Sequence, residues 1–234
     1  MVSALDALIL CGGLGTRLRP VLADRPKGLA EIRGRPFLDI LIGELMRRGL
    51  KRFILATGYG GEQIASRYAL RSDAEFVVSL EDRPLGTGGA VRLALPHLRS
   101  DPFIVANGDS FCDVDYAELQ RFHDGKRAQL SMVVVPPGTR DDVGTVLLDA
   151  SGAVVSFSEK TGRGEQACIN AGIYLMQRRL IEELPADTPV SLEREVFPAA
   201  ARRGGCYGFP VPGPVIDIGT PERYLAAQEL LRDG

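Results

Sequence analysis

The sequence predicts one α/β domain built on a doubly wound, mostly parallel mixed sheet with helices on both faces. In the first half of its 234 residues, short apolar runs alternate with segments whose apolar residues recur at helical spacing. That alternation is typical of a parallel, Rossmann-like sheet. From about residue 130, Gly or Pro turns join several of the apolar runs, which indicates a more antiparallel region. We expect one lobe over 1–128 and a second over 129–234.

The first half begins with an apolar strand at 7–10 that breaks into a glycine loop. Apolar residues at helical spacing predict a helix over 36–48, and Gly49 stops it. Pro96 ends another predicted helix, at 88–95, because proline disrupts a helix interior. The expected strands lie at 7–10, 28–33, 53–57, 75–80 and 102–106, and the expected helices at 36–48, 62–70 and 88–95.

The second half carries longer strands and fewer helices. Pro221 suits the first turn of the last helix, and Thr220 suits its N-cap. The expected strands lie at 130–135, 144–148, 153–158, 167–176 and 206–211, and the expected helices at 177–184, 191–202 and 221–231.

Composition argues against several classes of protein. The net charge is −2 and no basic tract stands out, so extended nucleic-acid binding is not expected. The N-terminus lacks the basic start of a signal peptide, and no apolar run has the length of a membrane span. Four scattered cysteines without a Cys-x-x-Cys pair indicate reduced thiols, and we expect a cytoplasmic protein.

The stretch from Leu8 to Lys27 combines a strand, a glycine loop and two cations. Gly12, Gly13 and Gly15 allow backbone N–H groups to approach a ligand closely, and Arg17 and Lys27 supply positive charge. This arrangement is typical of polyphosphate binding. The alternative is an ordinary turn with two surface cations. Neither the Walker pattern nor the full dinucleotide fingerprint is present.

Two aspartates close strands that are far apart in the sequence. Asp109 ends the sequence Asn107-Gly108-Asp109, and Asp217 precedes Gly219 and Thr220. Carboxylates at neighbouring strand ends suit Mg²⁺, a hard cation that prefers oxygen ligands. A turn or capping role is the alternative for each.

A second glycine-rich turn runs from Leu85 to Ala90 and begins a predicted helix. The turn is either a glycine-rich helix start or a flat wall along a nucleobase. Glu81 precedes it, and a carboxylate can accept two hydrogen bonds from the N1–H and N2 amine of guanine. This feature favours guanine over the pyrimidines.

Polar residues also close the strands of the second half. Glu159 and Asn170 are residue types that bind sugar hydroxyls, and Lys160 could neutralise a phosphate. The residues alone favour a plain exposed strand end at Glu159 and Lys160.

Taken together, these motifs closely resemble those of the sugar-1-phosphate nucleotidylyltransferases. The short chain and the forms of two motifs are most similar to the D-glycero-α-D-manno-heptose 1-phosphate guanylyltransferases. Mannose-1-phosphate guanylyltransferases and the uridylyl, thymidylyl and cytidylyl enzymes are close rivals. The matching motifs are the loop from Cys11 to Lys27, Pro84-Leu85-Gly86-Thr87-Gly88-Gly89, Asn107-Gly108-Asp109, Phe157-Ser158-Glu159-Lys160 with Asn170-Ala171-Gly172, and Asp217-Ile218-Gly219-Thr220-Pro221.

The resemblance implies a GT-A-like nucleotidyltransferase fold and a role for each matching residue. Mg²⁺ would be held by Asp109 and Asp217. The residues implied for catalysis are Arg17, Lys27, Asp109 and Lys160. Those implied for nucleotide binding are Leu10, Gly12, Gly13, Gly15, Thr16, Arg17, Lys27, Glu81, Gly86, Thr87 and Asn107. Those implied for the sugar phosphate are Gly144, Glu159, Lys160 and Asn170.

Two departures from the family pattern bear on the substrate and on domain content. Val143 stands where many relatives carry Tyr before Gly144, which alters the expected sugar pocket. No C-terminal β-helix is expected, which argues against a bifunctional enzyme.

The implied reaction transfers GMP from GTP to a sugar 1-phosphate, with heptose 1-phosphate favoured. Its products are GDP-heptose, for capsule, lipopolysaccharide or S-layer glycan synthesis, and pyrophosphate. A metal-dependent glycosyltransferase is the alternative of another class, but it usually lacks the Gly-x-Gly-Thr-Arg loop. A catalytically silent relative would be expected to have lost Arg17, Lys27 or a metal aspartate, and all are present. The sequence leaves a homodimer open.

Overall fold

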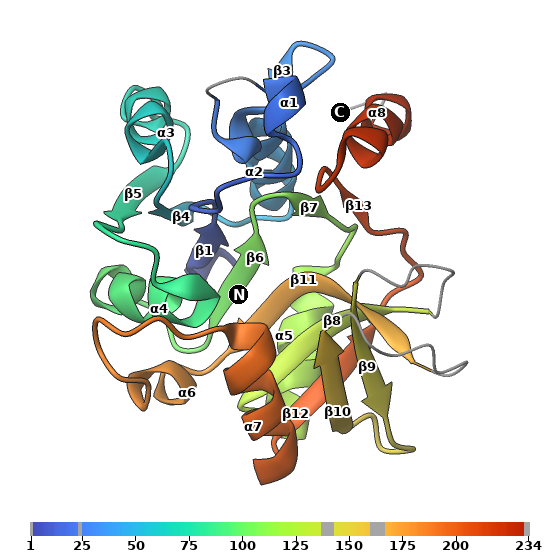
Figure 1. The fold of residues 1–234 in the computed structure, drawn as a ribbon. Coiled ribbons are helices and arrows are strands. Elements are labelled where there is room, and N and C mark those ends of the chain that lie inside the picture. Colours follow the sequence, from blue (N-terminus) through green and yellow to red (C-terminus); the bar gives the residue numbers. More distant parts are fainter. Residues whose placement is uncertain (1, 23–24, 137–142, 160–166, 232–234) are drawn as a thin grey trace.

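The computed structural model describes residues 2–22, 25–136, 143–159 and 167–231. Within these residues the chain forms a nine-stranded mixed sheet (Figure 1). Its main strand order is β10-β9-β11-β6-β1-β4-β5, with β8 paired to β11 and β12 paired to β8. The predicted fold class, a mostly parallel mixed sheet flanked by helices, is confirmed.

The first half supplies the parallel strands. β1 (Ala7–Leu10) lies between β4 (Arg52–Thr57) and β6 (Phe103–Asn107), and β5 (Glu75–Leu80) extends the sheet beyond β4. All of these pairs are parallel. The strands therefore end at one common edge of the sheet, where ligands gather in open α/β folds.

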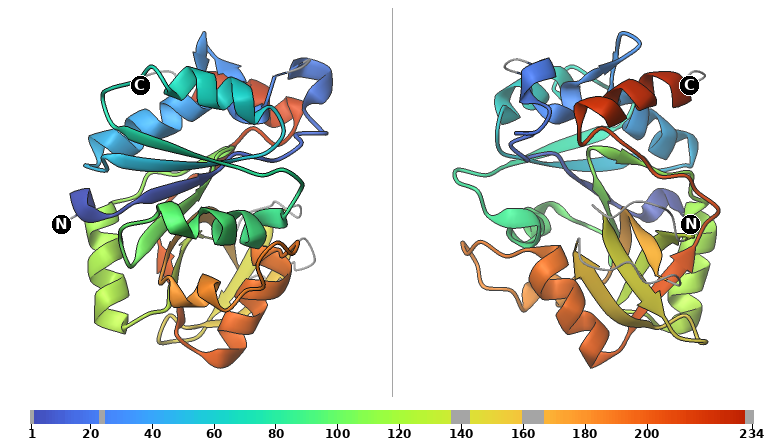
Figure 2. Two further views of the ribbon diagram at one scale, coloured as in Figure 1. Left: turned by 90° about the vertical axis from the view of Figure 1, so that its left-hand side faces the viewer. Right: turned by 45° about the vertical axis from the view of Figure 1, so that its right-hand side comes forward.

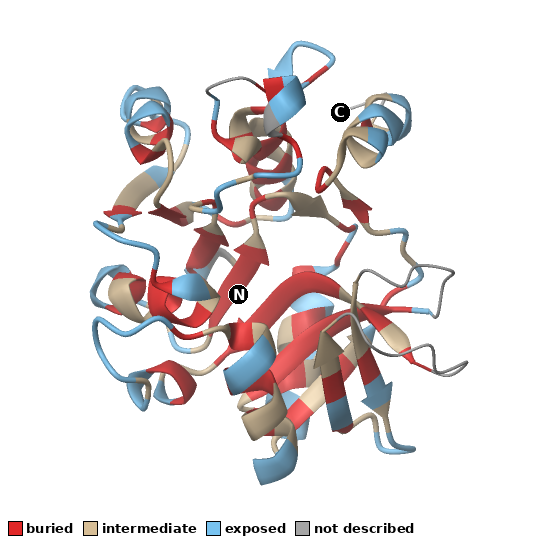
Figure 3. Ribbon diagram, viewed as in Figure 1, coloured by how far each residue is buried: buried red, intermediate tan, exposed pale blue. Residues whose placement is uncertain are grey.

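Helices cover both faces of these strands (Figure 2). α2 (Phe37–Arg47) and α3 (Gly61–Tyr68) pack on the face that carries Ile9 and Leu55. α4 (Gly86–Ala94) packs on the opposite face, with Leu8 and Ile54. Successive strand residues point to opposite faces, so a uniformly apolar strand is buried on both sides. Figure 3 shows this continuous buried band along the central strands.

The second half joins the sheet through β11 (Cys168–Met176), which runs antiparallel to β6, β8 and β9. Its pairing with β8 shifts register between Asn170 and Tyr174. The same long strand therefore pairs with β6 of the first half and with β8 of the second half. The other strands of this half are β8 (Leu130–Val135), β9 (Gly144–Leu148), β10 (Val154–Glu159) and β12 (Cys206–Pro210).

Several short elements differ from the sequence expectations. The predicted strand at 28–33 is instead a 3₁₀ turn, η2 (Lys27–Leu29), followed by the hairpin of β2 (Glu31–Ile32) and β3 (Arg35–Pro36). The predicted helix at 191–202 is a π-helical turn, η4 (Leu192–Val196), that continues into α7 (Phe197–Arg203). The remaining elements are η1 (Val2–Ala4), α1 (Arg19–Leu22), η3 (Leu95–His97), β7 (Ser110–Phe111), α6 (Arg179–Glu182), β13 (Ile216–Asp217) and α8 (Pro221–Leu230).

Sequence reasoning missed one full helix, α5 (Tyr116–Lys126). Asp115 caps it, because its carboxylate accepts hydrogen bonds from the backbone N–H groups of Ala117 (2.9 Å) and Glu118 (3.0 Å). Its buried side carries only Tyr116, Leu119 and His123. This face is too sparse to give a clear apolar periodicity.

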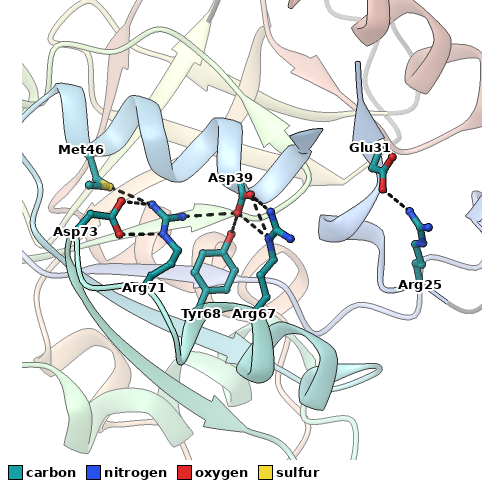
Figure 4. Close-up of polar contacts among 8 residues, drawn as sticks. All are labelled: Arg25, Glu31, Asp39, Met46, Arg67, Tyr68, Arg71 and Asp73. Atoms are coloured by element: carbon teal, nitrogen blue, oxygen red, sulfur yellow. Dashed lines mark hydrogen bonds and ion pairs between the residues drawn. The ribbon is translucent and has the colours of Figure 1, made fainter. Parts of the chain in front are cut away.

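An ionic network joins α2 to α3 (Figure 4). Asp39 on α2 accepts hydrogen bonds from the Arg67 guanidinium and, at 2.6 Å, from the Tyr68 hydroxyl. Arg71 adds an ion pair to Asp39 at 3.6 Å and pairs with Asp73 at 2.6 Å. Burial raises the pKa of the Asp39 carboxyl, but the hydrogen bonds from Arg67 and Tyr68 outweigh it and lower the pKa overall.

Among the helices that the structure describes, none combines the length and the apolar character needed to traverse a bilayer.

Candidate active site

A cavity of about 550 Å³ opens where the parallel strands end. The end of β1 contributes Leu10, Cys11 and Gly12 to its lining, and the end of β6 contributes Asn107 and Asp109. Most of the sequence-predicted nucleotide residues therefore meet in one place. The predicted residues that line the cavity are Leu10, Gly12, Gly13, Lys27, Glu81, Gly86, Thr87, Asn107 and Asp109.

The glycine loop wraps closely against the turn after β4. A Cβ on Gly12 would lie 2.8 Å from the backbone nitrogen of Gly58, so a side chain there would force the two loops apart. The later part of the loop lies away from the cavity, since its residues Gly15, Thr16 and Arg17 are not part of the cavity lining. Thr16 and Arg17 are exposed on the loop. The structure thus places the predicted triphosphate residues in two groups, an inner and an outer one.

Lys27 and Asp109 form an ion pair inside the cavity. Burial raises the pKa of the Asp109 carboxyl, but the Lys27 ammonium and a hydrogen bond from the Ser110 hydroxyl lower it by more. The net pKa of Asp109 is therefore below its ordinary value. Asp109 is therefore ionised at neutral pH. Pairing with a carboxylate holds the Lys27 ammonium at the floor of the glycine loop.

Asp217 lies beside Asp109 although the two are far apart in the sequence. β13 pairs with β7 so that Asp217 stands opposite Ser110, and the backbone N–H of Ile218 donates to the Asp109 carbonyl at 3.1 Å. The Oδ1 atom of Asp217 accepts from the Gly219 N–H (2.9 Å) and from the Arg223 guanidinium (3.1 Å).

This carboxylate pair fits Mg²⁺. Magnesium is held by one or two protein carboxylates and completes its shell with water and substrate phosphates. Within the described residues, no group of three or more His, Cys, Asp or Glu side chains could hold a metal ion, so water and substrate oxygens would have to complete the shell. Lys27 and Arg223 each pair with one of the two aspartates, and so partly neutralise the site.

The sugar-side residues lie together in the second half of the chain. Gly144 pairs with Glu159 across β9 and β10, and a Cβ on Gly144 would lie 3.5 Å from the Cβ of Asn170. Asn170 is held by Tyr174, since its Nδ2 donates to the Tyr174 hydroxyl at 2.7 Å. These residues are not part of the cavity lining. The predicted role of Lys160 falls outside the described residues.

Comparison with known proteins now identifies the family. Residues 6–234 match the sequence profile described as "Nucleotidyl transferase". The chain belongs to this family. The family predicted from the motifs is therefore confirmed.

Three relatives of this nucleotidyl transferase show how far the likeness extends. It is 38% identical to the mannose-1-phosphate guanylyltransferase of Mycobacterium tuberculosis over 94% of this chain, but spans only 62% of that protein. It is 33% identical to the D-glycero-alpha-D-manno-heptose 1-phosphate guanylyltransferase of Aneurinibacillus thermoaerophilus, over 97% of this chain and 99% of the other. The crystal structure of HddC from Yersinia pseudotuberculosis complexed with GMP-PN superposes with a TM-score of 0.85 at 33% identity, covering 97% and 100% of the two chains.

Two residues that line the cavity of this nucleotidyl transferase, Glu81 and Cys11, have perturbed titration. Burial raises the pKa of Glu81, although a hydrogen bond from the Leu85 N–H (3.0 Å) opposes the rise. Burial, with a smaller contribution from Glu81, raises the pKa of the Cys11 thiol to about 12. Cys11 is therefore a neutral lining residue rather than a nucleophile.

Sequence reasoning missed Glu193 of η4. It lines the large cavity and also a neighbouring depression of about 380 Å³ that contains Glu159 and Arg194. The sequence predicts only a helix for its segment, and no spacing or motif indicates a role for Glu193. Tyr59 and Gly58, which follow β4, are further lining residues that carried no earlier signal.

Proposed function

We propose that this protein transfers GMP from GTP to D-glycero-α-D-manno-heptose 1-phosphate, producing GDP-heptose and pyrophosphate. The observation that carries the proposal is one cavity that joins the glycine loop, the Lys27–Asp109 pair and Glu81. The end-to-end match to a heptose 1-phosphate guanylyltransferase supports this sugar. The enzyme would act in the cytoplasm, and its product would be used for the synthesis of a surface polysaccharide.

Mannose 1-phosphate is the second candidate sugar. The more identical relative from Mycobacterium tuberculosis carries that activity in its name, but the present chain spans about three fifths of it. The two candidates share the nucleotide half of the reaction and differ only in the sugar pocket.

Catalysis in this proposal depends on positioning and charge. The sugar phosphate attacks the α-phosphorus of GTP in line with the leaving pyrophosphate, and two anions must approach each other. Lys27 moves its ammonium from Asp109 to the triphosphate, whose oxygens are the stronger partner. Arg17 and Thr16, exposed on the loop, grip the outer phosphates. Mg²⁺ on Asp109 and Asp217 would supply further positive charge next to the reacting phosphate.

Specificity is divided between the two lobes, nucleotide-binding at 1–128 and sugar-binding at 129–234. Glu81 accepts hydrogen bonds from the N1–H and N2 amine of guanine, which pyrimidines cannot donate from one edge. Gly144, Glu159 and Asn170 bind the sugar, and Lys160 binds its phosphate.

A pyrophosphate-release screen tests this function. It crosses GTP, CTP, UTP, dTTP and ATP with the 1-phosphates of heptose, mannose and glucose. GTP with heptose 1-phosphate should give the highest kcat/KM. If UTP or dTTP is preferred, the role of Glu81 is wrong. If nucleoside diphosphate is released instead of pyrophosphate, the protein is a glycosyltransferase.

Variants test the catalytic roles. Lys27→Ala and Asp109→Ala should each lower turnover by roughly two orders of magnitude or more without unfolding the protein. Lys51→Ala is the matched control, because Lys51 is an exposed lysine that does not line the cavity. Pyrophosphate release near the wild-type rate in either variant would contradict the mechanism.

A further inference from the structure

The segment before α7 is bound tightly to the start of α4, and Figure 1 shows the two side by side. The Val190 N–H donates to the Leu85 carbonyl at 2.9 Å, and the Val190 carbonyl accepts from Gly88 (2.8 Å) and Gly89 (3.2 Å). A Cβ on Gly86 would lie only 2.6 Å from the Val190 carbonyl oxygen. The glycines of this turn therefore permit close contact with residues of the second lobe as well as lining the cavity.

Thr87 continues this contact through its side chain. Its hydroxyl donates to the Oε2 atom of Glu193 at 2.6 Å and accepts from the Leu192 N–H at 2.9 Å. Both its proton and a lone pair are therefore committed to η4. Thr87 lines the nucleotide cavity, but its hydroxyl serves to hold Glu193.

Glu193 is fixed on one side only. The Ser191 hydroxyl donates to the same Oε2 atom at 3.0 Å. Oε1 accepts no hydrogen bond from the residues that the structure describes. A carboxylate anchored through one oxygen presents the other as a strong, oriented acceptor.

The position of Glu193 indicates what that acceptor meets. The residue lines both the nucleotide cavity and the depression that contains Ser158, Glu159 and Arg194. Arg194 pairs with Glu159 at 2.7 Å, so one carboxylate of the depression already has a cationic partner and the Glu193 carboxylate lies beside that pair. A carboxylate repels phosphate and accepts hydrogen bonds from hydroxyl groups. The ligand group expected here is a ring hydroxyl.

We infer that Glu193 binds a ring hydroxyl of the acceptor sugar 1-phosphate and that Thr87 is the positioning residue that orients it. This inference rests on the proposed function and deepens it. It makes sugar binding depend on the nucleotide-side turn at residues 85–89, so the sugar is aligned by the same loop that borders the GTP cavity.

The test separates the two substrates. Glu193→Ala and Glu193→Gln are assayed for the KM of the sugar 1-phosphate at saturating GTP, and for the Kd of GTP by calorimetry. Each should raise the sugar KM by roughly 10- to 100-fold, the range for a lost hydrogen bond to a charged group. The Kd of GTP should change less than about threefold. Glu195→Gln is the matched control, an exposed carboxylate on the same turn, and should behave as wild type.

Thr87 provides the second readout. Thr87→Val should raise the sugar KM by about three- to tenfold, and Thr87→Ser should restore it, because serine keeps the hydroxyl. Folding of every variant is checked by its thermal midpoint.

The outcomes distinguish the inference from the function. If folded Glu193 variants keep the wild-type sugar KM, or if their defect falls on GTP affinity instead, the inference is overturned while the proposed function stands. If wild-type protein releases no pyrophosphate with any substrate pair, both fail.

Discussion

Gly86→Ala should destabilise the protein through backbone strain and a clash with the segment that contains Val190. Gly86 has φ +70°, which is a left-handed conformation, and it begins α4. An added Cβ would lie 2.6 Å from the Val190 carbonyl oxygen, an atom that already accepts hydrogen bonds from Gly88 and Gly89. The substitution therefore strains the backbone at residue 86 and also displaces the Val190 carbonyl.

The magnitude follows from those two effects. A left-handed alanine costs about 1–2 kcal/mol. Ordinary contact begins at 3.4 Å, so the Val190 segment must retreat by 0.8 Å from the present 2.6 Å. That retreat lengthens both hydrogen bonds to Val190 beyond useful range, at about 1 kcal/mol each. The expected loss is about 3–4 kcal/mol, or a fall in Tm of roughly 6–16 °C for a chain of this size.

Urea unfolding followed by circular dichroism measures this effect as a fall in midpoint at constant m. Gly125→Ala is the matched control, because Gly125 lies in α5 with open space around its Cβ position. That variant should gain about 0.5–1 kcal/mol from helix propensity. A Gly86→Ala protein within about 1 kcal/mol of wild type would refute the reasoning.

Three other measurements test further features. Burial lowers the pKa of His123, whose Nδ1 lies 2.9 Å from the Ser131 hydroxyl. The contribution of this histidine to stability is present above about pH 6.5 and is lost as the pH falls. The urea midpoint of His123→Gln should therefore depend less on pH below that value than the midpoint of the wild type. Asp39→Ala should cost about 1–3 kcal/mol and Tyr68→Phe less, because only the first leaves the Tyr68 hydroxyl and the Arg67 guanidinium without the partner they share; equal urea midpoints would contradict this. Asp217→Asn should raise the Mg²⁺ concentration for half-maximal activity by roughly tenfold or more, and an unchanged value would exclude Asp217 as a ligand.

Much of the fold could be predicted because its signals are local. The strands β5, β8 and β9 begin and end where the apolar runs predict, and Gly49 follows Arg48, the C-cap of α2. The sequence failed where the signal was weak or where packing overrode it. α5 has few apolar residues on its buried side, and the strand expected at 28–33 is folded back into a hairpin.

The site shows the same division. The glycine loop, Lys27, Glu81 and Asp109 were predictable, because a loop that follows a parallel strand must lie at the ligand edge of the sheet. Glu193 was not predictable, because its importance arises only from the place to which the second half of the chain brings it.

The sequence by itself determined most of the strands, the glycine loop and the family, since periodicity, glycine content and motif order are properties of neighbouring residues. Only the tertiary structure decided that β13 pairs with β7, which brings Asp217 beside Asp109. It also decided that Thr87 holds Glu193, although the two residues are far apart in the sequence. Contacts between residues far apart in the chain depend on topology, and a linear sequence does not display which distant segments share an edge.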